Sequence, residues 1–115
     1  MAENRSYTRM HVTWHAAIRL PDKSIIQAKV INVTNVGMQF LCSENLAIGQ
    51  KYEMQIHVPD LNGSQSTTLV PCFAECIYVI LAGRDFRIGA KFSGLSGEHS
   101  ALIIKWSDRC LRGAA

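Results

Sequence analysis

The segment that decides the class of fold reads YEMQIHV, from Tyr52 to Val58. Its apolar side chains alternate one by one with polar ones. In an extended chain successive side chains point to opposite faces, so this period of two gathers the apolar groups on one side. The segment therefore predicts a β-strand with one face in a core and the other in water.

The same alternation recurs along most of the chain. It predicts five further strands, separated by turns and loops rich in Gly, Pro, Asn, Asp and Ser. Pro71 falls inside the longest run, and because proline cannot donate a ladder hydrogen bond, we expect an edge, a bulge or a bend there. The predicted strands are 12–20, 25–31, 36–42, 52–58, 67–81 and 86–92.

The period changes near the C-terminus. Ser96 is suited to cap a helix, Glu98 lies in its first turn, and Gly113 can end it. The apolar residues of this segment recur at helical spacing and share one face; they are Leu102, Ile103, Trp106 and Cys110. Six strands with short turns and one helix predict a mainly β fold, a six-stranded antiparallel β-barrel with a C-terminal α-helix. A sandwich is the alternative, but only a barrel removes the open edges.

Length and composition favour a single domain. The chain has 115 residues, of which 48% are hydrophobic and 18% are charged, as is typical of a globular protein. The first ten residues have no periodic apolar pattern. We therefore expect a mobile N-terminal arm, residues 1–10, followed by the barrel domain with its terminal helix, residues 11–112.

Composition also limits the environment and the partners. The formal net charge of +3 is too small to indicate a nucleic-acid polymer as the partner. No apolar run approaches about 18 residues, so we expect no membrane insertion. Residues 1–10 have no apolar signal segment, which favours the cytoplasm. Without a Cys-x-x-Cys pair, the cysteines are expected to be reduced and mostly buried.

Two short polar motifs stand outside the apolar pattern. Arg5 and Arg9 form an R-x-x-x-R sequence in the arm, and their Cα atoms lie at most about 13–14 Å apart if the arm is extended. Arginine makes bidentate phosphate contacts and stacks on flat rings, so the pair suits an anionic ligand; a solvated basic tail is the alternative. Asn32, Thr34 and Gly37 form an N-x-T-x-x-G turn between two predicted strands. Its short polar groups and its backbone N–H groups can face a ligand.

In this order and context, the two motifs resemble those of the PilZ domain family, R-x-x-x-R and D/N-x-S/T-x-x-G. The resemblance extends over nearly the whole chain, from about residue 4 to residue 106. It implies a barrel that binds the bacterial second messenger cyclic di-GMP, with no further cofactor. By this resemblance Arg5 and Arg9 hold the phosphates and stack on or hydrogen-bond guanine. Asn32 and Thr34 contact the ligand from the barrel, and Gly37 allows a tight turn.

Two positions depart from the usual family pattern. Thr34 stands where serine is more usual, which keeps the hydroxyl but adds a methyl group that must fit. Asn4 precedes the first arginine, at a position where many members have another arginine. This difference could weaken binding or alter the number of ligand molecules that stack in the site.

Further ligand contacts are predicted with lower priority. For the two basic residues, Arg87 and Lys91, a solvated strand face is an equal alternative, and Tyr7 could equally pack on the barrel. The five residues are Asn4, Tyr7, Asn35, Arg87 and Lys91.

The leading function is a cyclic di-GMP receptor that orders its N-terminal arm on binding and signals to a protein partner. The alternative is a PilZ-like adaptor that binds no ligand and acts in pilus or motility control. An oligonucleotide-binding barrel would need exposed aromatics between basic residues, whereas the aromatics here mainly alternate inward. No nucleophile–base pair or carboxylate cluster indicates an enzyme. His11 and His15 share a strand face, but no third metal ligand is evident in the sequence, so we expect no metal site.

Overall fold

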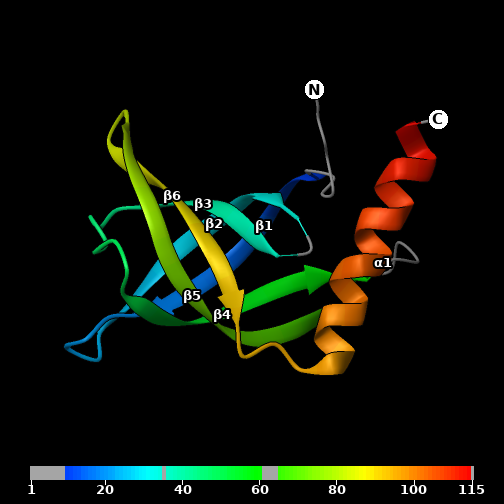
Figure 1. Ribbon diagram of the computed structural model, residues 1–115, viewed down its shortest axis with the longest axis horizontal. Helices are drawn as coiled ribbons and strands as arrows, with labels where there is room; N and C mark the ends of the chain where they lie inside the picture. Colours follow the sequence, from blue (N-terminus) through cyan, green and yellow to red (C-terminus); the bar gives the residue numbers. More distant parts are fainter. Residues whose placement is uncertain (1–9, 35, 61–64, 115) are drawn as a thin grey trace.

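The computed structural model describes residues 10–34, 36–60 and 65–114. Over these residues the chain forms a closed barrel with the strand order β1-β2-β3-β6-β5-β4, and a helix lies at one end of it (Figure 1). The elements are β1 (Met10–Arg19), β2 (Ile25–Val33), β3 (Gly37–Cys42), β4 (Lys51–Pro59), β5 (Thr67–Ala82), β6 (Asp85–Ser93) and α1 (Gly97–Ala114). The predicted fold class is confirmed.

Every neighbouring pair of strands is antiparallel, and pairing of β1 with β4 closes the barrel. The chain departs from a simple meander once, because β3 pairs with β6 and not with β4. The loop between β3 and β4 therefore crosses one end of the barrel. Leu46 of this loop is buried, and the Ala47 N–H donates to the Tyr52 hydroxyl over 2.8 Å. This loop thus helps to exclude water from that end of the core.

The barrel interior is filled by the apolar set of each strand. Each strand contributes at least one side chain that is almost fully buried, and each such side chain contributes roughly 1.5–3 kcal/mol. Examples, one from each strand in chain order, are Ile18, Val30, Phe40, Ile56, Val70 and Ile88. These side chains are the inward half of the predicted alternation.

Cys42, Cys72 and Cys76 are free and buried, as predicted, while Cys110 lies beyond the side chains that the structure describes. Burial raises the pKa of the Cys72 thiol to about 11, so this group is protonated at neutral pH. These three cysteines therefore act as small core residues.

The strand register shifts at three places among the described residues, in β1 between His11 and Trp14, in β2 and in β5, and the last two concern the site. In β2, Val30 pairs with Phe40 and Asn32 pairs with Gln39, the neighbour of Phe40 on β3. Ile31 is therefore the extra residue of a bulge in β2. In β5, a one-residue shift falls between Cys76 and Tyr78. A bulge reverses which face the subsequent side chains occupy. If the alternation of buried and exposed residues at the start of each strand continued unbroken, Asn32 and Tyr78 would point into the core. The bulges place both on the outer face.

The start of β1 and the end of α1 differ from the sequence-based expectation, whereas Pro71 lies at an edge, one of the three alternatives expected for it. β1 begins at Met10, so the last residue of the expected arm lies in the strand. β5 runs through Pro71 with an unbroken register to β4, and its bulge comes later. Its pairing with β6 begins only at Phe73, so Pro71 occupies an edge, where the missing N–H is tolerated. α1 passes Gly113 to end at Ala114, because glycine permits a helix end without forcing one.

Helix α1 is anchored to the barrel by aromatic and apolar contacts. Ser96 caps it as predicted, since its Oγ accepts the His99 N–H over 3.1 Å. The ring centroids of Trp14 and Trp106 lie 5.7 Å apart in an edge-to-face arrangement, and the Trp106 Nε1–H donates to the Pro59 carbonyl over 3.0 Å. Ile103 of the same helix is buried. Both tryptophans therefore anchor the helix to the core.

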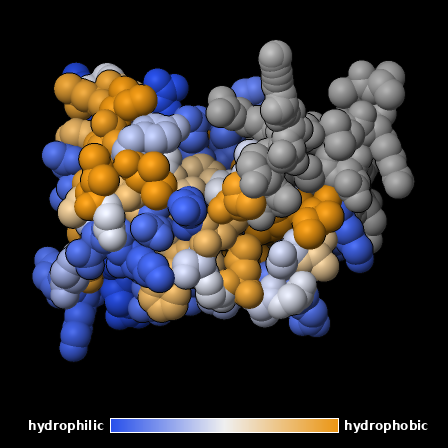
Figure 2. Space-filling view, viewed as in Figure 1, coloured by the Kyte–Doolittle hydropathy of each residue, from blue (hydrophilic) through white to orange (hydrophobic). Residues whose placement is uncertain are grey.

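The outer surface carries some apolar side chains. Ile80 and Leu81, near the tip of the β5–β6 hairpin, are 44% and 69% exposed, and Figure 2 shows hydrophobic surface over this hairpin. Within the described residues, no helix has the length and apolar character that crossing a membrane requires.

Candidate functional site

The turn between β2 and β3 is closed by Thr34. Its Oγ1 accepts the N–H groups of Val36 and Gly37 over 3.2 and 3.1 Å, and its hydroxyl lies 3.3 Å from the Gly37 carbonyl oxygen as a donor. The Thr34 N–H donates to the same carbonyl over 2.8 Å. One donor and two acceptor sites are all that a hydroxyl has. The expected display of backbone N–H groups to a ligand is therefore wrong for Thr34, Val36 and Gly37, because the turn uses these groups itself.

Gly37 is required by the close approach of β3 and β6. It pairs with Lys91, and a Cβ atom at this position would overlap the carbonyl oxygen of Ala90. The Phe92 N–H donates to the Val36 carbonyl over 2.9 Å and ties the turn to β6. The glycine of the motif thus fixes the turn against its neighbouring strand.

A row of polar side chains runs across the outer face of the barrel beside this turn. Asn32 of β2 pairs with Gln39 of β3, Gln39 pairs with Gly89 of β6, and Gly89 pairs with Tyr78 of β5. The Asn32 Nδ2 donates to the Gln39 Oε1 over 2.7 Å, and the Gln39 Nε2 donates to the Tyr78 hydroxyl. The Tyr78 ring lies over Gly89, where a Cβ atom would collide with it. Four strands therefore hold one continuous hydrogen-bonded row.

The row and the turn border the same hollow, about 200 Å³ in volume. Its lining comes from β2, β3, β5, β6 and the turn. The residues are Asn32, Thr34, residues 36–39, Ile77, Tyr78 and residues 89–91. The Asn32 Oδ1 is buried and has no hydrogen-bond partner among the described residues. A buried acceptor without a partner, on a residue that lines a mainly apolar hollow, would gain from a ligand that donates a hydrogen bond.

The structure brings together Asn32, Thr34, Gly37 and Lys91 of the predicted site residues. Arg87 does not line this hollow; its Nε is buried with no hydrogen-bond partner among the described residues. The other predicted residues lie outside the described part of the chain, so their predictions stay untested. They are Asn4, Arg5, Tyr7, Arg9 and Asn35.

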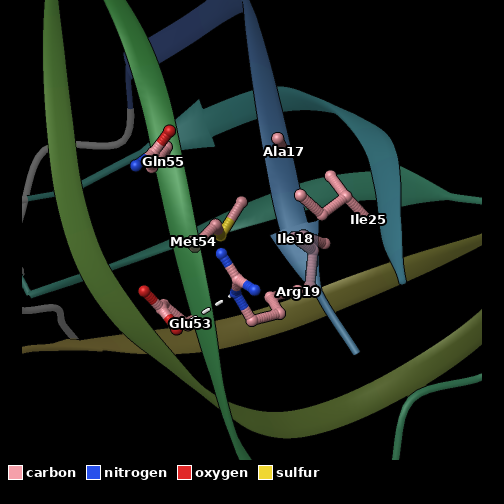
Figure 3. A pocket seen from close by; sticks show the side chains of 7 residues that line it. All are labelled: Ala17, Ile18, Arg19, Ile25, Glu53, Met54 and Gln55. Atoms are coloured by element: carbon pink, nitrogen blue, oxygen red, sulfur yellow. Dashed lines mark ion pairs between the residues drawn. The ribbon is translucent and has the colours of Figure 1, made fainter. Parts of the chain in front are cut away.

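Two other hollows have less suitable linings. Figure 3 shows a small one between β1 and β4, of about 50 Å³, where the Arg19 Nε lies 3.4 Å from the Glu53 Oε1. That volume suits one or two water molecules. A larger hollow of about 400 Å³ is bordered by His15, Lys29 and Asp85 among others, and contains no residue of either motif. Among the described residues, no three His, Cys, Asp or Glu side chains form a possible metal site.

Comparison with known protein families decides the classification. The sequence matches the PilZ domain over residues 3–109. This chain belongs to the PilZ domain family. A comparison with curated protein sequences found no match.

Several solved structures share the PilZ fold. The Bacillus subtilis inhibitor of motility, MotI/DgrA, has a TM-score of 0.81 at 13% identity; the match covers 99% of this chain and 54% of that one. The PilZ domain of Escherichia coli YcgR, solved with c-di-GMP, has a TM-score of 0.70 at 15% identity over 97% of this chain and 95% of that one. A complex of K. pneumonia MrkH with c-di-GMP has a TM-score of 0.67 at 10% identity, over 98% and 55%. The chain thus spans about half the length of MotI/DgrA and of MrkH.

Three residues of the site of this PilZ barrel were missed by sequence reasoning, namely Gln39, Tyr78 and Gly89. Gln39 and Gly89 occupy ordinary outward positions of alternating strands, and Tyr78 is outward only because of a bulge. Glycine inside a strand is a signal that could have found them, since it often marks a bulge or a close approach. Gly89 marks the place where Tyr78 crosses β6.

We expect Gly37→Ala to lower the free energy of unfolding by about 1–3 kcal/mol, as overpacking at a rigid contact does. The added Cβ would meet a backbone oxygen, which cannot turn aside as a side chain can. Urea unfolding followed by circular dichroism measures the change. Gly97→Ala is the matched control, because a Cβ there meets open space. Equal stability of Gly37→Ala and the wild type would contradict the close approach.

Proposed function

We propose that this PilZ protein is a cytoplasmic receptor for cyclic di-GMP, which binds between the barrel and the N-terminal arm. The observation that carries the proposal is the convergence of Asn32, Thr34 and Gly37 on one hollow, with the exposed Lys91 at its edge. Family membership supports it, and so do the similar structures of YcgR and MrkH that contain c-di-GMP.

The proposed roles follow from the chemistry of each group. Arg5 and Arg9 hold the phosphates by charge-assisted hydrogen bonds and cover the guanines. The Asn32 Oδ1, which is buried and has no partner among the described residues, would accept a hydrogen bond from the ligand once binding exposes it. Lys91 adds a positive charge for a phosphate. Thr34 acts by holding the turn, because its hydroxyl is already fully engaged.

Several contacts of lower priority complete the proposed site. They come from the arm and from the turn. They are Asn4, Tyr7 and Asn35. Arg87 is not included, because it does not line the hollow.

The energetics suit a sensor. Each charge-assisted hydrogen bond contributes about 1.5–3 kcal/mol. Fixing the backbone of five arm residues costs on the order of 5–10 kcal/mol. These terms largely offset one another, so moderate affinity with a large change in the arm is the expected outcome. The ordered arm would then form or cover a surface for a protein partner.

A second candidate is a PilZ adaptor that binds no cyclic di-GMP and contacts a protein partner in pilus or motility control. The observation in its favour is the exposed apolar surface of the β5–β6 hairpin, with Ile80 and Leu81. Scattered apolar side chains are common on protein surfaces, so this observation is weaker than the convergence at the hollow.

Calorimetric titration with cyclic di-GMP tests the receptor proposal. We expect the wild type to bind and Asn32→Ala to bind about 1–3 kcal/mol more weakly, roughly 5- to 150-fold, because a buried acceptor for the ligand is lost. Gln27→Ala is the matched control, an exposed amide on the same strand that does not line this hollow. No heat at several temperatures from folded wild type would favour the adaptor instead.

A further inference from the structure

A second row of side chains crosses the outer face of the barrel next to the polar row described above. Lys29 of β2 pairs with Leu41 of β3, and Leu41 pairs with Arg87 of β6. Arg87 in turn pairs with Ile80 of β5, while Lys29 pairs on its other side with His15 of β1. Neighbouring strands lie about 4.7–4.9 Å apart, so the row places one side chain at each such step. Basic and apolar groups thus follow one another across five strands.

The basic groups of this row have no partner within the protein. Among the described residues, His15, Lys29 and Arg87 make no side-chain hydrogen bond and no ion pair. His15 and Lys29 are exposed, whereas Arg87 is half-buried and its Nε is buried. A guanidinium that is partly removed from water without a carboxylate beside it costs free energy. A carboxylate from another molecule would offset this cost.

The row borders a hollow that also contains one acidic group. His15, Lys29 and Leu41 line the hollow of about 400 Å³, and so does Asp85. Asp85 comes two residues before Arg87 on β6, so it lies about 7 Å to one side of the row. A carboxylate on the row would be attracted by Lys29 and Arg87, but one displaced toward Asp85 would be repelled. The hollow therefore limits where an acidic group can lie.

The spacing of the row suits an α-helix that lies across the strands. One face of a helix presents a side chain about every 5.4 Å, close to the distance between strands. One face of an extended peptide presents a side chain only about every 6.6 Å, which falls out of step with the strands. The outer surface of a barrel is convex, so a straight helix contacts the middle of the row best, at Lys29, Leu41 and Arg87.

We propose that this row is the docking surface for an acidic amphipathic helix of a protein partner. Helix carboxylates seven residues apart bind Lys29 and Arg87, and an apolar side chain halfway between them packs on Leu41. The inference rests on the proposed function only in that it gives the partner of the receptor its chemistry. Leu41 and Arg87 come two residues along their strands from Gln39 and Gly89, which line the ligand hollow. The docked helix therefore lies beside the ligand.

A helical peptide tests the proposal without cyclic di-GMP. The probe has about 14 residues, roughly four turns, and is held helical by a side-chain staple on its far face. It carries glutamates at positions i and i+7 and a leucine at i+4. Fluorescence anisotropy should show that it binds the wild type, and that Lys29→Glu and Arg87→Glu each weaken binding at least about tenfold.

Reversal of single peptide charges shows whether these contacts are specific. Replacing one glutamate of the probe with lysine should restore binding to Lys29→Glu, and replacing the other should restore binding to Arg87→Glu. Asp85→Asn should strengthen binding of the original probe about two- to fivefold, because a nearby like charge is removed. Arg84→Glu is the matched control, since it reverses an exposed charge in the β5–β6 turn outside the row.

Several results would overturn the proposal. They are a wild type that does not bind the probe, equal losses in Lys29→Glu, Arg87→Glu and Arg84→Glu, and equal restoration by either lysine peptide. The last two would reduce the interaction to net charge. Binding of phosphatidylglycerol vesicles but not of the peptide would assign the face to a lipid surface instead. Asn32→Ala should bind the probe as the wild type does, so a failed titration with cyclic di-GMP overturns the receptor function and leaves the docking surface standing.

Discussion

Replacing Arg9 with alanine should weaken the binding of cyclic di-GMP by about 2–5 kcal/mol, roughly 30- to 4,000-fold. The proposed contact is a charge-assisted bond to a phosphate that is shielded from water once the ligand is bound, and its loss leaves that charge without a partner. Arg5→Ala should have an effect of similar size. Calorimetric titration at fixed ionic strength measures both, because salt screens the general attraction of a basic protein for an anion.

Arg84→Ala is the matched control for this prediction. It removes the same charge from an exposed turn between β5 and β6 and does not line the hollow. Its affinity should stay close to that of the wild type. Hydrogen exchange over residues 1–10 adds a second readout, since a ligand that joins the arm to the barrel should slow it. Equal losses of affinity in Arg9→Ala and Arg84→Ala would show that Arg9 contributes only to the net charge of the protein and makes no specific contact with the ligand.

Trp106→Ala should lower the free energy of unfolding by about 3 kcal/mol, at the lower end of the range for large aromatic side chains. The substitution removes the edge-to-face contact with Trp14 and the hydrogen bond to the Pro59 carbonyl. Because both contacts join α1 to the barrel, helical circular dichroism should be lost at a lower urea concentration than in the wild type.

Two further variants divide this effect into its parts. Trp106→Phe keeps a ring but loses the N–H donor, and should cost about 1 kcal/mol. Ile104→Ala changes a neighbouring residue of α1 that is 44% exposed, and should change stability by less than about 0.5 kcal/mol. A Trp106→Ala protein as stable as Ile104→Ala would show that α1 is held by other contacts.

The alternation of apolar residues was sufficient to predict the strands, and the need to remove open edges favoured the barrel over a sandwich. Alternation works because each strand has one face in the core, as β4 does along its whole length from Lys51 to Pro59. The closing pairs of the barrel could not be derived from alternation, since any amphipathic strand can pair with any other. The pairing of β3 with β6, in place of β4, joins strands that are far apart in the sequence, so no short stretch of sequence predicts it.

The turn of the candidate site could be predicted from the sequence, but its neighbours could not. Asn32, Thr34 and Gly37 are close in sequence, so the turn that unites them has a local signal. The bulges have none, because an extra residue such as Ile31 leaves composition unchanged while it reverses the face of the side chains after it. Simple alternation assigns Asn32 to the same inner face as Ala28 and Val30. Its outward orientation, and with it the contact to Gln39, depends on that one residue.

The pairing of Trp14 with Trp106 has a spectroscopic consequence. These are the two tryptophans of the sequence, one on a barrel strand and one on the helix, and neither lines the hollow. Intrinsic fluorescence excited at tryptophan therefore reports on the joint between α1 and the barrel. A shift of emission on addition of a ligand would signify a change in the surroundings of these two rings. The protein thus contains its own optical reporter for the contact between α1 and the barrel.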